Sequence, residues 1–151
     1  MATINDVIVN LSKTITNGTG WRCGPLSDNP NVPCVEVWPD NIGGGESYYD
    51  AMKRGVVNLP FVAYVLIGST ALRTDQLKLL EAISPHGPRS IPQSIFNAPT
   101  LGTSQTESIS DPATSMTAHV VGVDDYGFTD SPAGRLLGAK VRVNVMVRGD
   151  I

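Results

Sequence analysis

Few residues of this sequence have the types and the spacing that metal binding would need. The thiols are Cys23 and Cys34, and the imidazoles are His86 and His119. Structural zinc sites pair their ligands across only a few intervening residues, and none of these four positions has such a neighbour. His119 also lies in phase with apolar residues of a predicted strand, which favours a position in the core or at an interface. We therefore expect neither a metal ion nor another cofactor.

Residues for nucleophilic or acid–base catalysis are equally scarce. The segment Gly68-Ser69-Thr70 lies between a predicted strand and a predicted helix, but it lacks the second glycine and the lysine of a phosphate loop. Helix capping by Ser69 or Thr70 explains it fully. Asp124 and Asp125 are adjacent carboxylates, yet adjacent strand residues point to opposite faces, so only special backbone geometry would let them act on one bond. We interpret them as turn residues and expect no enzyme.

The composition suits one domain over residues 1–151, with a core of ordinary size. Charged residues make up 17% of the chain, against about 25% in most soluble domains. Either other subunits cover part of the surface, or the surface is simply rich in Ser, Thr, Asn and Gly. The net charge of -3 argues against general affinity for nucleic acid. Because no signal peptide and no long apolar run is present, we expect a cytosolic chain with reduced thiols and no membrane contact.

Hydrophobic periodicity predicts an alternation of helices and strands. Helices are expected over about 4–16, from Ser69 or Thr70 to about 83, and in a short segment capped by Ser90; strands over 34–38, 60–67, 116–123 and 136–147. Residues 18–33 are predicted as a loop, 103–115 as a flexible polar loop, and 124–134 as a turn region, while 47–55 fits either a helix or a strand. Prolines at 33 and 39 place the first strand at or near a sheet edge. This order predicts an α+β fold: an antiparallel sheet of about four strands with two to three helices packed against it.

The segment from Leu136 to Val147 is the clearest strand, because its side chains alternate without interruption. One side is apolar: Leu137, Ala139, Val141, Val143, Val145 and Val147. The other side carries Lys140, Arg142 and Asn144, with Met146 as its apolar exception. We expect the apolar side, including Val143 and Val145, to be buried and the basic side to face outward.

Several motifs, in a fixed order, resemble a known family. They are Arg54-Gly55, Leu59-Pro60-Phe61, the stretch from Leu79 to Ile91 with its Gly-Pro-Arg-Ser-Ile ending, Leu101-Gly102, the Asp-Tyr-Gly at 125–127, and Leu137-Gly138-Ala139. This order is similar to that in tail-terminator (tail-to-head joining) proteins of long-tailed actinobacterial phages. The resemblance covers about residues 30–148. It departs from the family at Thr103–Ser115, where only a few residues are expected.

The resemblance implies a structural virion protein without enzymatic activity. In that family, identical subunits form a homohexameric ring that caps the tail tube, stops its growth and docks it to the head-tail connector or neck protein. Assembly in the host cytoplasm, a final place at the head-proximal end of the tail, and passage of phage DNA through the lumen without specific binding are implied as well. The alternatives are a neck or head-completion protein one ring removed and, from a different class, a small soluble enzyme or ligand-binding module. A deep pocket with converging polar groups would favour the last of these.

Candidate contact residues lie in polar or flexible segments and on the basic side of the last strand, where binding functions are common. They could contact neighbouring subunits or the tube and connector proteins, or be ordinary solvated residues. The candidates are Gly44, Glu46, Tyr49, Lys53, Arg54, Asp125, Tyr126, Arg135 and Arg142.

Overall fold

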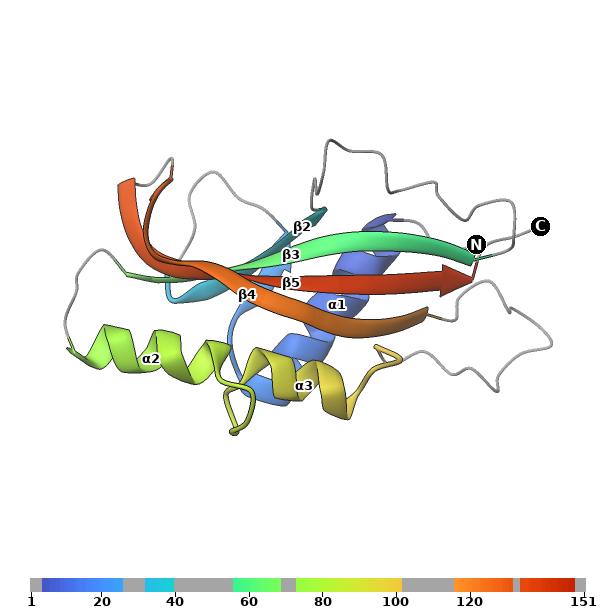
Figure 1. Cartoon of the computed structure of the whole chain (residues 1–151), viewed down its shortest axis with the longest axis horizontal. Coiled ribbons are helices and arrows are strands. Elements are labelled where there is room, and N and C mark those ends of the chain that lie inside the picture. Colours follow the sequence, from blue (N-terminus) through green and yellow to red (C-terminus); the bar gives the residue numbers. More distant parts are fainter. Residues whose placement is uncertain are drawn as a thin grey trace.

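Five strands form one mixed sheet, and three helices pack against one of its faces (Figure 1). The computed structural model describes residues 4–25, 32–39, 56–68, 73–101, 116–131 and 134–148. The elements follow in the order α1 (Ile4–Thr19), β1 (Cys23–Pro25), β2 (Cys34–Pro39), β3 (Val56–Gly68), α2 (Arg73–Ile83), α3 (Ile91–Asn97), β4 (Met116–Ser131) and β5 (Gly134–Arg148). Across the sheet the order is β1-β2-β3-β5-β4. The α+β prediction is confirmed, with one more strand than expected.

The first helix forms because its apolar residues repeat at the helical period. Val7, Leu11 and Ile15 are fully buried on one side of α1, as their spacing predicts. The helix continues to Thr19, three residues beyond the predicted end at 16. There the Thr19 hydroxyl donates a hydrogen bond back to the Ile15 carbonyl, 2.6 Å away and one turn earlier in the helix.

The extra strand lies in the segment that was predicted to be a loop. β1 has only three residues and pairs in parallel with β2, so the sheet is mixed. Its pairing means that β2 is next to an edge of the sheet and does not form the edge itself. β3 runs from Val56 to Gly68, longer than the predicted 60–67, and lies in the centre between β2 and β5.

The largest correction concerns residues 124–134, which were predicted to be a turn region. β4 continues through them to Ser131, and β5 already begins at Gly134. Two irregularities interrupt the pairing, one between Val120 and Gly122 and one between Asp124 and Gly127. Extra residues of this kind break the alternation by which a strand is recognised in a sequence, and they increase its bend. The far end of the β4–β5 hairpin accordingly curls away from the rest of the sheet, at the left of Figure 1.

Of the two positions predicted for His119, the core is wrong, and a position at an interface stays a prediction. His119 is exposed and pairs with Asn144 on the sheet face that the helices leave free. The extra residue Val121 lies between the two paired positions Val120 and Gly122. Because this residue shifts the alternation by one, His119 and Val123 are on opposite faces although their spacing is even.

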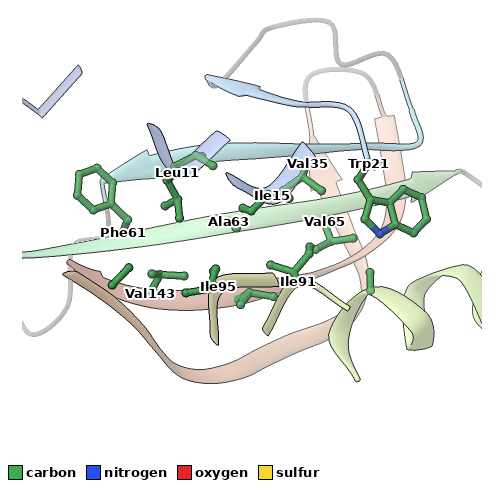
Figure 2. Close-up of a cluster of buried hydrophobic side chains, with 14 of the residues drawn as sticks. Leu11, Ile15, Trp21, Val35, Phe61, Ala63, Val65, Ile91, Ile95 and Val143 are labelled. Atoms are coloured by element: carbon green, nitrogen blue, oxygen red, sulfur yellow. The ribbon is translucent and has the colours of Figure 1, made fainter. Parts of the chain in front are cut away.

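The core lies between the sheet and the helices. Figure 2 shows side chains of α1, β2, β3, α3 and β5 meeting there, with Trp21 at one end of the cluster. The Trp21 indole nitrogen donates a hydrogen bond to the Arg89 carbonyl over 2.9 Å, and the Arg89 guanidinium lies 3.7 Å from the ring centre. This contact joins the segment after α1 to the segment before α3.

The predicted cap of the short helix α3 is confirmed. The Ser90 hydroxyl accepts a hydrogen bond from the Gln93 backbone nitrogen, and Pro92 occupies the first turn. Ile91 and Ile95 are buried on the side of α3 that faces the sheet. The cap expected at Ser69 or Thr70 and the polar loop 103–115 lie outside the described residues. Among the helices described, none is long and apolar enough to cross a membrane.

Candidate functional site

The sheet face opposite the helices, here called the outer face, collects the polar side chains of three strands. Alternation along β5 places Lys140 and Arg142 on this face, while Val141 and Val143 are buried on the other. In register with them, β3 contributes Tyr64 and β2 contributes Glu36. The prediction that the basic side of this strand faces outward is confirmed. The helices thus leave a surface on which charged and aromatic groups are held by a rigid sheet.

Two ion pairs link β4 to β5 on the outer face. The Arg142 Nε donates to Asp124 Oδ2 over 2.6 Å, and the Lys140 Nζ lies 3.1 Å from Asp125 Oδ2. The hydrogen bond that Lys140 donates to Asp125 raises the pKa of Lys140 above its ordinary value, and desolvation opposes that shift. The Lys140 ammonium also lies 5.7 Å from the centre of the Tyr64 ring. These contacts fix the charged side chains of β5 against the neighbouring strand.

The backbone explains why two adjacent aspartates reach the same face. Asp125 has a φ of 52°, in the left-handed region, where Asp is tolerated better than most residues. Asp125 and Tyr126 together oppose the single residue Ala139 between the pairs Asp124–Lys140 and Gly127–Gly138, so β4 has one extra residue here. The expectation that the carboxylates point to opposite faces is therefore corrected by the special geometry of this bulge. Each carboxylate is paired with a cation, so the arrangement holds a strand in place and does not form an acid–base pair.

The structure places four of the nine predicted contact residues, and all four lie on the β4–β5 hairpin. Asp125 and Arg142 form the ion pairs just described. Tyr126 is 70% exposed beside them, whereas the Arg135 guanidinium lies 5.0 Å from the centre of the Phe128 ring, nearer the end of the hairpin. Gly44, Glu46, Tyr49, Lys53 and Arg54 lie outside the described residues.

Exposed aromatic residues are a feature that the sequence analysis missed. Phe96 on α3 is 79% exposed and Trp38 on β2 is 45% exposed. A signal for Phe96 was present, because Ile91 and Ile95 define the buried side of this helix and Phe96 lies off it. Trp38 is in phase with Glu36, on the polar side of its strand. Large exposed aromatic residues often mark surfaces that other proteins cover.

The two cysteines lie in different parts of the fold. Cys23 packs against the helix-side core, whereas Cys34 belongs to a small outer-face cluster with Leu66 and Leu136. Cys23 is in register with Val35, the residue after Cys34, so the two thiols are on opposite faces of the sheet. Both are free thiols. Burial raises the pKa of Cys23 to about 12, which makes it a poor nucleophile at neutral pH.

Two grooves lie at opposite edges of the sheet. The groove between α3 and β4 has a volume of about 710 Å³, and its lining includes Pro92, Phe96 and Val120. Its polar residues His86 and Gln93 already contact each other, with 3.1 Å between Nδ1 and Oε1. The groove between α1 and β1 has a volume of about 290 Å³. His119 also lines the first groove, and the polar residues Ser12, Lys13 and Asn17 line the second, so both linings combine apolar residues with a few polar ones.

Comparison with known proteins adds no identification. No protein-family model matches the sequence, and no curated protein matches it significantly. Within the part of the chain that the structure describes, no group of three or more His, Cys, Asp or Glu side chains could hold a metal ion. The outer face of the sheet and the two sheet edges are therefore the surfaces on which a function can be argued.

Proposed function

We propose that this chain is a structural virion protein whose copies form a hexameric ring that caps the tail tube of a long-tailed phage. The ring stops growth of the tube and docks it to the head-side connector. The ordered motifs from Arg54 to Ala139, which resemble tail-terminator proteins, carry this proposal. The α+β sheet with helices on one face agrees with the fold that this resemblance implies.

The outer face supports an assembly function on physical grounds. Its ion pairs hold Lys140, Arg142, Asp124 and Asp125 in fixed positions, so a partner would meet an ordered pattern of charge. Tyr126 lies next to this pattern and remains exposed. Ordered charges give an interface its register, while an exposed aromatic side chain supplies most of the area that can be buried.

Termination of a growing tube requires two different ring faces. One must imitate a tube subunit well enough to bind the last ring of the tube, and the other must lack the site that the next tube ring would use. DNA must pass through the ring without binding to it. The net charge of -3 agrees with that requirement, since tight binding to DNA needs clusters of Lys and Arg.

Deleting the gene from a producing phage tests the proposal. We expect filled heads beside unattached tails, many of them abnormally long, in electron micrographs of the lysate. Complementation with the intact gene is the control. Tails of normal length joined to heads would contradict the proposal. Unattached tails of normal length would instead favour a neck protein one ring removed.

A further inference from the structure

The two edges of the sheet carry opposite charge. β4 forms one edge, and its sequence contains three Asp and no Lys, Arg or Glu. At the other edge, the exposed Arg22 directly precedes β1, and the exposed Lys13 lines the groove between α1 and β1. A β4 edge and a β1 edge would attract each other, and such complementarity selects partners and their orientation.

The registers of the strands put Gly24 of β1 at the same level as Asp124 of β4. One row of paired residues crosses the whole sheet from edge to edge: Gly24, Glu36, Tyr64, Lys140 and Asp124. The pairings also make β4 run opposite to β1. A second copy placed beside β4 in the same orientation would therefore present its β1 as an antiparallel neighbour, with Arg22, two residues before Gly24, near Asp124. Lys13 of α1 would lie on the helix side of the same edge.

Both aspartates can take part in such a contact although they already form ion pairs. The side chains of Asp124 and Asp125 are 45% and 55% exposed. A carboxylate oxygen accepts more than one hydrogen bond, so a second cation can join each pair. At Asp124 it would join through Oδ2, because Oδ1 is buried. A contact of this kind would build a network of charges from the two copies.

Tyr126 is the residue that could anchor the contact. It lies in the bulge directly after the two aspartates. The groove at the opposite edge is lined by Ile8, Val9 and Pro25 together with the polar side chains of Ser12 and Asn17. Its volume of about 290 Å³ exceeds the roughly 150 Å³ of an apolar cavity that binds benzene. An aromatic ring fits there, and the Asn17 side chain can pair with its hydroxyl group.

We propose that the bulge Asp124–Tyr126 of one copy docks head to tail on the α1/β1 edge of the next, with Tyr126 in the groove and Lys13 and Arg22 against the aspartates. The proposal deepens the ring function proposed above and rests on it for the choice of a second copy as the partner. Because the two surfaces differ, the contact is heterologous, and heterologous contacts between identical chains build rings when the rotation closes.

Sedimentation equilibrium of the purified full chain at low salt tests this contact. We expect reversible association that weakens as salt is added. Tyr126→Ala should reduce the association constant by roughly 30-fold, as removal of an anchoring aromatic residue does. Lys13→Glu combined with Arg22→Glu should also weaken association and remove much of its dependence on salt. All these residues are exposed, so the unfolding transitions should stay unchanged.

Phe96→Ala is the matched control, because Phe96 is more exposed than Tyr126 but lies outside the proposed contact. Its association constant should equal that of the natural chain. A natural chain that stays monomeric at every concentration would overturn the proposal. So would a Tyr126→Ala variant that associates normally, or a Phe96→Ala variant that is the weaker of the two.

The outcome is separable from that of the gene deletion, since sedimentation needs no phage. If the chain associates through Tyr126 but deletion of its gene leaves tails normal, the proposed contact stands and the tail-capping function is wrong. If the chain is needed for normal tails but its association does not depend on Tyr126, Lys13 and Arg22, the tail-capping function stands and the proposed contact is wrong.

Discussion

The two faces of β5 differ in how strictly packing limits the side chains that each position can accept. Toward the helices, Val141, Val143 and Val145 are almost completely buried in a core to which most of the elements contribute. Toward the outside, Lys140 and Arg142 are held by one neighbouring strand and remain partly exposed. A protein that needs only to fold could place any polar residues on that second face. The ordered charges found there are therefore where selection for a partner would act.

Val143→Asp should have the largest effect on this comparison, because it places a carboxylate in the helix-side core. A buried charge without a partner costs several kcal/mol, which is comparable with the whole stability of a small domain. We expect no folded protein on expression. Asn144→Asp introduces the same group one residue later on the outer face and should give a normal yield and unfolding transition. If Asn144→Asp abolished folding while Val143→Asp did not, the two faces would be assigned the wrong way round.

Gly138→Ala sharpens the comparison, because it shows that the outer face is not tolerant everywhere. A Cβ at position 138 would lie 2.1 Å from the Val65 carbonyl oxygen, so the backbone of β3 would have to move. Overpacking of this kind costs about 1–3 kcal/mol. Gly122→Ala is the control, since a Cβ there meets no atom within 4 Å; its stability should change by less than about 0.5 kcal/mol. Equal urea midpoints for the two variants would contradict this prediction.

The sequence alone predicts strands and helices whose apolar residues repeat at one regular spacing, and it predicts helix caps formed by neighbouring residues. The alternation of β5, the apolar run of β3 and the Ser90 cap of α3 each predict their own structure. β1 was missed because three residues, one of them Pro25, are too few for a periodic signal, and only pairing with β2 makes them a strand. The same limit hid the continuation of β4, since its extra residues break the alternation and the pairing with β5 restores it.

The candidate site was less predictable than the fold, for a physical reason. Arg142 was found from its strand position alone, and Asp125 and Tyr126 from a polar segment. That Asp124 and Asp125 share one face depends on a left-handed backbone at position 125, which no pattern of residue types specifies. The level of β1 relative to these aspartates depends on four strand pairings at once. Geometry of that kind appears only when the whole sheet is assembled.

Asp125→Asn should have the smallest effect, and it tests whether the outer-face ion pairs are needed for stability. Asn also tolerates the left-handed conformation, so the variant removes the charge and keeps the backbone. Exposed ion pairs contribute about 0–1 kcal/mol, and both side chains of this pair are partly exposed. We expect a loss within that range in urea unfolding at pH 7, and a smaller loss in high salt.

The pH dependence of that difference has a definite sign. Asp125 raises the pKa of Lys140 in the folded protein above the 10.5 of an ordinary lysine. The stabilisation is therefore fully present below 10.5 and is lost as the pH rises through the raised value, where the folded state also releases the proton. The natural chain and Asp125→Asn should converge in stability at that alkaline end. The control is the same Asp125→Asn change made in a Lys140→Gln background, where its effect on stability should not change over this pH range. A loss of more than about 2 kcal/mol at neutral pH, beyond the range of exposed ion pairs, would mean that this face is needed for folding and is not free for assembly.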